Sequence, residues 1–183
     1  MVGRIDPSKG QEAFIKAAAG LRKRPRKGEK LKFVIVGEQT LGFTGDYLEE
    51  LKKMVNQFQL GDQVIFDGYQ ENIPEVMRAF DIFVMPSHQE ALGLVAVEAM
   101  AMECPIVISR GISAREVVGQ GEFGLLMRPG DAFDLQQCLR YLIDNPMKRV
   151  QIGQKARLHV IGYYDRKVRV RKTLDLFSRS LIQ

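Results

Sequence analysis

PSHQEALGLVAVEAMAM, spanning Pro86 to Met102, contains the end of a strand, a polar loop and the helix that follows. The strand is predicted over Ile82 to Ser87 (IFVMPS), and Glu90 lies in the loop behind it. From Leu94 to Met102 the residues are apolar on nearly every side of a helix, Glu98 excepted, which is typical of a helix within the core. This stretch therefore predicts one strand–loop–helix unit of a layered α/β domain.

Similar units extend along the chain in both directions. Short runs rich in β-branched and aromatic residues predict buried strands at Lys32 to Gly37, Gln63 to Gly68, Pro105 to Arg110 and Gly124 to Pro129, and the opening MVGRID is one more. Amphipathic helices are predicted at Lys9 to Leu21, Tyr47 to Phe58, Asp131 to Asp144, Arg149 to Ile161 and Asp165 to Leu181. Strands that alternate with helices imply a parallel sheet covered on both faces. We therefore expect a doubly wound, Rossmann-like α/β domain of about six strands.

The length of 183 residues and the hydrophobic share of 45% are those of a single globular domain with a full core. No apolar run approaches the about 20 residues that a membrane-spanning helix needs, and the first residues do not resemble a signal peptide. The two cysteines, Cys104 and Cys138, form no metal-binding spacing, so we expect free thiols in the cytoplasm. Much of the net charge of +5 comes from two basic runs, Arg22 to Lys30 and Arg166 to Lys172. These runs are either solvated or attracted to an anionic surface such as the inner face of a membrane, and no nucleic-acid-binding signature accompanies them.

Residues at the predicted carboxyl ends of the strands are candidates for binding a ligand, because doubly wound sheets bind ligands there. Glu90 occupies such a loop, and the helix that starts after Gly93 offers free backbone N–H groups suited to a phosphate. Glu98 lies in the apolar helix, so we expect it to be buried and to need hydrogen-bond donors, either ribose hydroxyls or backbone N–H groups. Arg4 and Lys9 follow the opening strand and add two cations at the same edge. These residues alone leave open whether they form a diphosphate site or are solvated and structural.

The ordered set of motifs resembles the C-terminal domain of glycosyltransferase family 4, whose members are retaining enzymes with the GT-B fold. The resemblance covers essentially the whole chain, because VGRIDPSKG, KFVIVG, VIFDGY, AFDIFVMPS, EALGLVAVEAMA, PIVIS and GLLMRPGD follow one another in the family's order. The most specific motif is a pair of glutamates separated by seven residues, Glu90 and Glu98. The resemblance implies that residues 1–183 form a nucleotide-sugar-binding domain and that the N-terminal, acceptor-binding domain is absent from this chain.

The resemblance also implies a role for each site residue. Arg4 and Lys9 would bind the diphosphate and stabilise the leaving group, and Glu90 would bind hydroxyls of the donor sugar. Other donor-binding residues would be Leu92, Gly93, Leu94, Glu98, Tyr69 and Asn72. The backbone amides of Leu92, Gly93 and Leu94 would support the sugar and the phosphate. The Glu98 carboxylate would hold the ribose, and Tyr69 and Asn72 would lie near the base. No metal or cofactor is implied beyond the nucleotide-diphosphate sugar that serves as the donor substrate.

The implied reaction transfers a sugar to an acceptor, such as a growing glycan or a lipid-linked sugar, with retained anomeric configuration. The chain departs from the family pattern around the strand PIVIS, where Glu103 and Cys104 replace Gly and Thr, and Arg115 stands where Pro is usual. These differences border the expected cleft between donor and acceptor. Without the acceptor-binding domain, we expect this fragment to bind nucleotide but not to catalyse transfer efficiently.

Three alternatives remain open. Another GT-B class, such as a nucleotide-sugar epimerase or a phosphorylase-like enzyme, would share the fold, although the chain shows no cofactor-binding lysine pattern for the second. A non-catalytic nucleotide-sugar-binding module would bind the ligand and transfer nothing, even beside a partner domain. A flavodoxin-like or response-regulator interaction domain would carry an acidic cluster after the first strand, where this chain has Arg4 and then Asp6 in a Pro turn.

Overall fold

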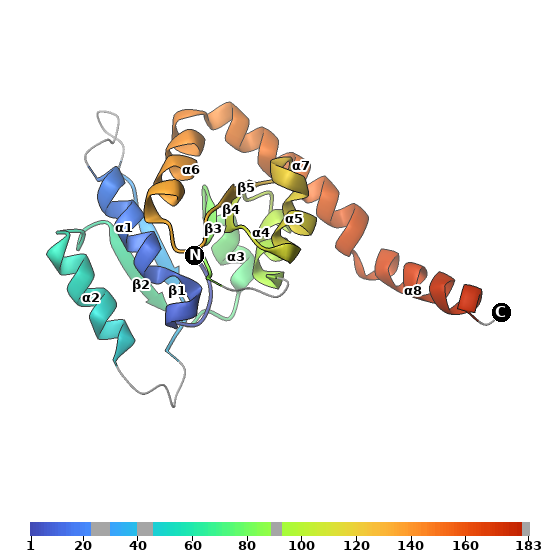
Figure 1. Cartoon of the computed structure of the whole chain (residues 1–183), viewed down its shortest axis with the longest axis horizontal. Helices are drawn as coiled ribbons and strands as arrows, with labels where there is room; N and C mark the ends of the chain where they lie inside the picture. Colours follow the sequence, from blue (N-terminus) through green and yellow to red (C-terminus); the bar gives the residue numbers. More distant parts are fainter. Residues whose placement is uncertain (23–29, 40–45, 89–92, 181–183) are drawn as a thin grey trace.

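The computed structural model describes residues 1–22, 30–39, 46–88 and 93–180, and all of its strand pairings are parallel. The strands are β1 (Phe33–Val36), β2 (Val64–Gly68), β3 (Phe83–Met85), β4 (Ile106–Ser109) and β5 (Leu125–Met127). β1 pairs with β2, and β4 lies between β3 and β5 (Figure 1). Each of these strands lies within a run that the sequence predicts to be a buried strand.

The opening segment lies between these two groups of strands. Val2 and Ile5 form isolated parallel bridges with β1 and the residues after it, and residues 1–3 share a cavity with Val84 and Met85 of β3. The chain adds strands outward from this segment in both directions, so the strand order reverses beside it, which is the usual place for a ligand. The opening segment, expected from the sequence to be the sixth strand, therefore joins the sheet only through isolated bridges at Val2 and Ile5.

Helices separate consecutive strands and follow the last one. They are α1 (Gln11–Leu21), α2 (Tyr47–Gln57), α3 (Ile73–Arg78), α4 (Leu94–Ala101), α5 (Ile112–Val118), α6 (Ala132–Asp144), α7 (Pro146–Tyr164) and α8 (Arg166–Ser180), with short 3-10 turns at Pro7–Lys9 and Gly119–Gly121. Six of them match predicted helices. The other two, α3 and α5, have six and seven residues, too few for a periodic apolar pattern to stand out.

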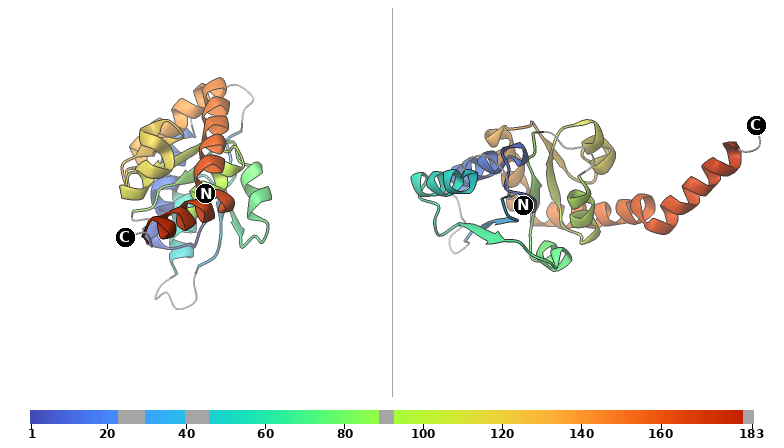
Figure 2. Two further views of the ribbon diagram at one scale, coloured as in Figure 1. Left: turned by 90° about the vertical axis from the view of Figure 1, so that its right-hand side faces the viewer. Right: turned by 90° about the horizontal axis from the view of Figure 1, so that it is seen from below.

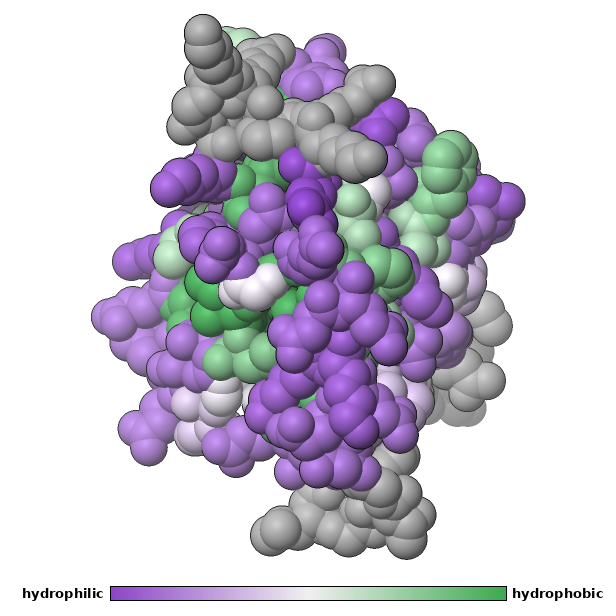
Figure 3. All heavy atoms as spheres, turned by 90° about the vertical axis from the view of Figure 1, so that its left-hand side faces the viewer, coloured by the Kyte–Doolittle hydropathy of each residue, from purple (hydrophilic) through white to green (hydrophobic). Residues whose placement is uncertain are grey.

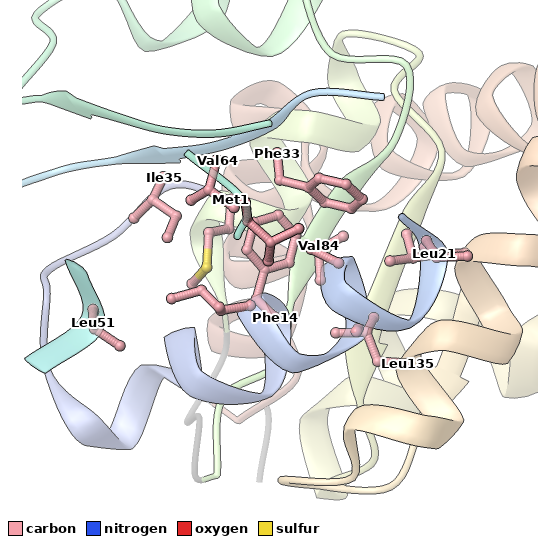
Figure 4. Packing of buried hydrophobic residues seen from close by; sticks show 14 of the residues in the cluster. Met1, Phe14, Leu21, Phe33, Ile35, Leu51, Val64, Val84 and Leu135 are labelled. Carbon is pink, nitrogen blue, oxygen red and sulfur yellow. The ribbon is translucent and has the colours of Figure 1, made fainter. Parts of the chain in front are cut away.

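Helices cover both faces of the sheet, as the alternation of elements predicts. Side chains alternate along β4, because Val107 packs into one core cluster while Ile106 and Ile108 pack into another. The first cluster is covered by α1, α2 and α6, and the second by α3, α4, α5 and α7. Figure 4 shows the first cluster, in which the rings of Phe14 and Phe33 meet edge to face at 5.7 Å and tie α1 to β1.

α2 covers one end of the molecule and turns its polar side to solvent. Its own residues Leu51 and Val55 are buried on the side that faces the core. The Asp46 carboxylate caps the first turn of α2 by accepting a hydrogen bond from the Glu49 N–H over 3.2 Å. The surface on this side is accordingly mostly hydrophilic (Figure 3).

α8 extends away from the rest of the molecule at the opposite end (Figures 1 and 2). The basic run from Arg166 to Lys172 lies on this helix and is exposed apart from Val168. Leu174 and Phe177 are also exposed, by 60% and 64%. In the described part of the chain, no helix combines the length and the apolar character needed to cross a membrane.

The buried thiol of Cys104 should make the stability of the fold depend on pH. Burial in the second core cluster raises the pKa of Cys104 from its ordinary value of 9.0 to about 12. The unfolded thiol ionises near its ordinary pKa while the folded thiol stays protonated, so its contribution is complete below pH 9 and is lost as pH rises towards 12. We expect the free energy of unfolding to fall by up to about 1.4 kcal/mol per pH unit in this window.

Urea unfolding between pH 8 and about pH 11 measures this dependence, with Cys104→Ala as the control that removes the group. The variant should lose less stability per pH unit than the parent, whatever its stability at pH 8. Burial also raises the pKa of Tyr47, to about 12, so a residual slope above pH 10 remains in the variant. Parallel curves for parent and variant would contradict the assignment to Cys104.

Candidate functional site

The Asp6–Gly10 turn follows the opening segment and carries Lys9. The Asp6 carboxylate accepts hydrogen bonds from the hydroxyl and the N–H of Ser8, over 2.6 and 2.8 Å. These bonds hold the pKa of Asp6 below its usual value. Gly10 ends the turn with a φ of 74°, in the left-handed region where side chains with a Cβ are strained. The turn thus has a fixed shape from which Lys9 extends.

The turn packs directly against the loop that follows β3. A Cβ atom on Gly10 would lie 2.1 Å from the carbonyl oxygen of Pro86, so glycine permits an approach that no other residue allows. The N–H of His88 donates a hydrogen bond to the carbonyl of Ser8 over 2.8 Å. The ring of His88 packs against Gly130, where a Cβ atom would lie 2.7 Å from the ring carbon Cε1. These contacts fix Lys9 beside the carboxyl end of β3.

A cavity of about 370 Å³ lies at this position, between the opening segment, β3 and the start of α4. Its lining residues are Met1, Val2, Gly3, Lys9, Val84, Met85, Ser87, Gly93, Leu94 and Val95. Gly93 precedes α4 with a φ of 61° and, as the N-cap residue, brings no side chain to cap the first N–H groups of this helix. A lysine and the amino end of a helix therefore face one cavity, an arrangement that attracts an anion such as a phosphate.

A larger cavity, of about 490 Å³, lies at the opposite, amino edge of the strands. It is lined by Phe33 and Ile82 near the starts of β1 and β3, by Ile143 of α6, and by Arg149, whose guanidinium pairs with Asp81 at 3.4 Å. Open parallel sheets bind ligands outside the carboxyl ends of their strands. We therefore take the smaller cavity beside Lys9 as the candidate site.

Arg4 and Glu98 both differ in setting from what the sequence suggests. The side chain of Arg4 is 63% exposed, and its guanidinium lies 3.9 Å from the Asp6 carboxylate. Arg4 is not among the residues that line the cavity. The expectation of a buried Glu98 is wrong, because its side chain is exposed. Leu94, one helical turn earlier, is 56% exposed, so one stripe of α4 faces solvent while its other sides are buried. The carboxylate of Glu98 therefore does not require a buried partner.

The remaining predicted residues lie around the site or outside the described residues. Tyr69 follows β2 and is 66% exposed. The side chain of Asn72 caps α3 by accepting a hydrogen bond from the Glu75 N–H at 3.4 Å, a structural role in addition to the predicted place near the base. Glu90 and Leu92 lie outside the described residues. Among the residues that are described, no group of three or more potential metal ligands occurs.

Two residues that shape the site, Gly10 and Ser87, are not predicted from the sequence. Ser87 is 2% exposed and lines the cavity at the end of β3. The glycine after Lys9 could have been recognised as the end of a short turn before a helix, since left-handed glycines commonly occupy such positions. No pattern in the sequence indicates that this glycine would meet Pro86, a residue 76 positions away.

Known proteins resemble this chain over most of its length. The family described as glycosyl transferases group 1 matches residues 1–159. D-inositol 3-phosphate glycosyltransferase 2 from Catenulispora acidiphila is 33% identical over 98% of this chain, which covers 42% of that protein. Alpha-D-kanosaminyltransferase from Streptomyces kanamyceticus is 31% identical over 85% of this chain, which covers 38% of that protein. The chain thus spans about two fifths of the length of these curated relatives.

Solved structures show the same fold. HepE from Anabaena in complex with UDP-glucose superposes with a TM-score of 0.85 and 28% identity, over 97% of this chain and 47% of that one. The C-terminal domain of LpcC, a glycosyl transferase group 1 family protein from Francisella tularensis, gives a TM-score of 0.80 and 33% identity, over 90% of this chain and 85% of that one. The chain belongs to the glycosyl transferases group 1 family and has the fold of the C-terminal domain of a GT-B glycosyltransferase.

Proposed function

We propose that this chain is the donor-binding domain of a retaining glycosyltransferase, and that the donor is a uridine diphosphate sugar. The observation that carries the proposal is that Lys9 and the amino end of α4 at Gly93 line one cavity, at the point where the strand order reverses. A diphosphate placed there would accept hydrogen bonds from the free N–H groups of the helix and from the lysine ammonium.

The same placement supplies what the reaction needs from these residues. As the bond between the sugar and the diphosphate breaks, negative charge grows on the leaving phosphate. Lys9 and the amides after Gly93 are fixed before the reaction starts, so they can stabilise that charge without first reorganising. Glu98 is exposed on the next turn of α4, where its carboxylate is free to accept hydrogen bonds from ribose hydroxyls.

Uridine is proposed as the base because of two solved structures that share this fold. HepE, at 28% identity, was crystallised with UDP and UDP-glucose, and TarM from S. aureus, at 25% identity, with UDP. Tyr69, exposed beyond the end of β2, is the proposed contact for the base. Retention of configuration is proposed from the spacing of Glu90 and Glu98, which is the signature of the resembling family.

The acceptor, a glycan or a lipid-linked sugar, is proposed to bind a separate N-terminal domain of the whole protein. Both cysteines are free thiols, which suits a protein of the reducing cytoplasm. A non-catalytic module that binds the same donor would differ only in the activity of the whole protein.

Calorimetric titration of the chain with UDP, GDP, ADP and UMP tests the proposal. We expect UDP to bind with a dissociation constant between about 1 μM and 1 mM, more tightly than the other nucleoside diphosphates. UMP should bind at least about tenfold more weakly than UDP, because it lacks the second phosphate for Lys9 and the α4 amides. No heat with any nucleotide, or equal affinity for UMP and UDP, would contradict a diphosphate site here.

A further inference from the structure

Gln11, the first residue of α1, is buried without being fully hydrogen-bonded. Its side chain is 0% exposed, and its amide nitrogen Nε2 donates to the carbonyl oxygen of Arg4 over 2.8 Å. The other end of the same amide, Oε1, is buried and has no hydrogen-bond partner within the part of the chain that the structure describes. Since the Arg4 carbonyl can only accept, the amide must turn its NH₂ group towards Arg4 and leave its oxygen unpaired. A half-satisfied buried amide costs stability relative to an apolar side chain of the same shape.

The bond from Gln11 closes a loop around the cationic turn. Arg4 stands at the start of this loop, Lys9 near its end, and the Gln11 amide joins the two ends. Inside the loop, the N–H of Lys9 donates to the carbonyl of Asp6 over 2.9 Å, and the carboxylate of Asp6 lies 3.9 Å from the guanidinium of Arg4. The Arg4 end is therefore held by a side chain that enters from α1, and the Lys9 end by the turn itself.

We propose that Gln11 is a positioning residue for the diphosphate site: by bonding the Arg4 carbonyl, it ties the turn that carries Lys9 to the opening segment. This inference rests on the function proposed above and adds to it a role for a residue that does not line the cavity. With the loop closed, the turn that carries Lys9 is tied to the opening segment, so Lys9 loses little freedom when the diphosphate binds. With the loop open, this turn must be ordered during binding, and that ordering weakens affinity.

The substitution Gln11→Met separates this role from an ordinary role in folding. Methionine fills nearly the same volume but donates no hydrogen bond, and it removes the unpaired buried oxygen. We expect Gln11→Met to unfold at the same urea concentration as the parent or a higher one, and to bind UDP about three- to tenfold more weakly. The exposed Gln154 on α7 provides the matched control, because Gln154→Met should change neither measurement.

A double-mutant cycle asks whether Gln11 acts through Lys9. In a chain that already carries Lys9→Ala, adding Gln11→Met should change UDP affinity by less than about twofold, since the cationic group being positioned is gone. An equal loss of affinity in both backgrounds would overturn the proposal. So would parental UDP affinity in Gln11→Met, or a variant that fails to fold, because the amide would then serve stability. If the parent chain itself binds no UDP, the proposed function fails first, and that outcome is visible before any variant is made.

Discussion

Lys9→Ala should weaken binding of UDP by about 10- to 100-fold. Of the described residues that line the cavity, Lys9 is the one with a cationic side chain. A hydrogen bond from a charged group contributes about 1.5–3 kcal/mol, and each 1.4 kcal/mol corresponds to roughly a factor of ten in the dissociation constant. Calorimetric titration with UDP measures the change, and the loss should be greater at low salt than at high salt because the interaction is between charges.

The control for this variant is Lys16→Ala, on the exposed side of α1. Lys16 pairs with Glu12 at 3.2 Å, and both side chains are about half exposed, so its removal should change neither stability nor UDP affinity appreciably. Lys9→Ala should remain within about 1 kcal/mol of the parent in free energy of unfolding. UDP affinity within a factor of two of the parent would contradict the placement of the diphosphate beside Lys9.

Gly10→Ala should cost about 3 kcal/mol or more in free energy of unfolding. Two costs combine at this position. The left-handed backbone, with φ at 74°, costs an alanine about 1–2 kcal/mol. The added Cβ atom would also lie 2.1 Å from the Pro86 carbonyl oxygen, so the Asp6–Gly10 turn must move away from the loop after β3. Urea unfolding measures the loss of stability. Titration with UDP measures the loss of binding that we expect when the turn moves.

Gly61→Ala is the matched control for the glycine substitution. An added Cβ atom at Gly61 would meet nothing within 4 Å, so this variant should stay within about 0.5 kcal/mol of the parent. If Gly10→Ala were as stable as Gly61→Ala, the contact between the turn and Pro86 would not exist in solution.

Most of the fold could be predicted because its elements are strongly patterned. Strands such as β4 are continuous apolar runs, and α6 begins at an acidic cap, Asp131, whose carboxylate accepts a hydrogen bond from the Asp134 N–H at 2.8 Å. The opening MVGRID was predicted as a strand from the same pattern, yet it forms only isolated bridges. Gly3, which adopts a φ of 154° within it, adds no side chain to pack and weakens regular strand structure.

The site could be predicted only as far as topology determines it. Lys9 and Gly93 each follow a predicted strand. Parallel strands on the two sides of the reversal point end at the same edge of the sheet, so the order of elements is enough to bring these two residues together. The burial of Glu98 was misjudged because apolar residues on all sides of α4 conceal the one stripe that faces solvent. The role of Gln11 depends on a contact with a main-chain carbonyl, which no side-chain pattern reports.

The most direct test of the central claim is a nuclear magnetic resonance titration of the labelled chain with UDP, which follows every backbone amide at once. The claim is that the diphosphate lies between Lys9 and the start of α4, so the largest shifts should occur at Lys9 and at Gly93 to Val95. Shifts concentrated instead at Leu31, Ile82 and Ile143, around the cavity at the amino edge, with the Lys9 and Gly93 amides unchanged, would contradict it.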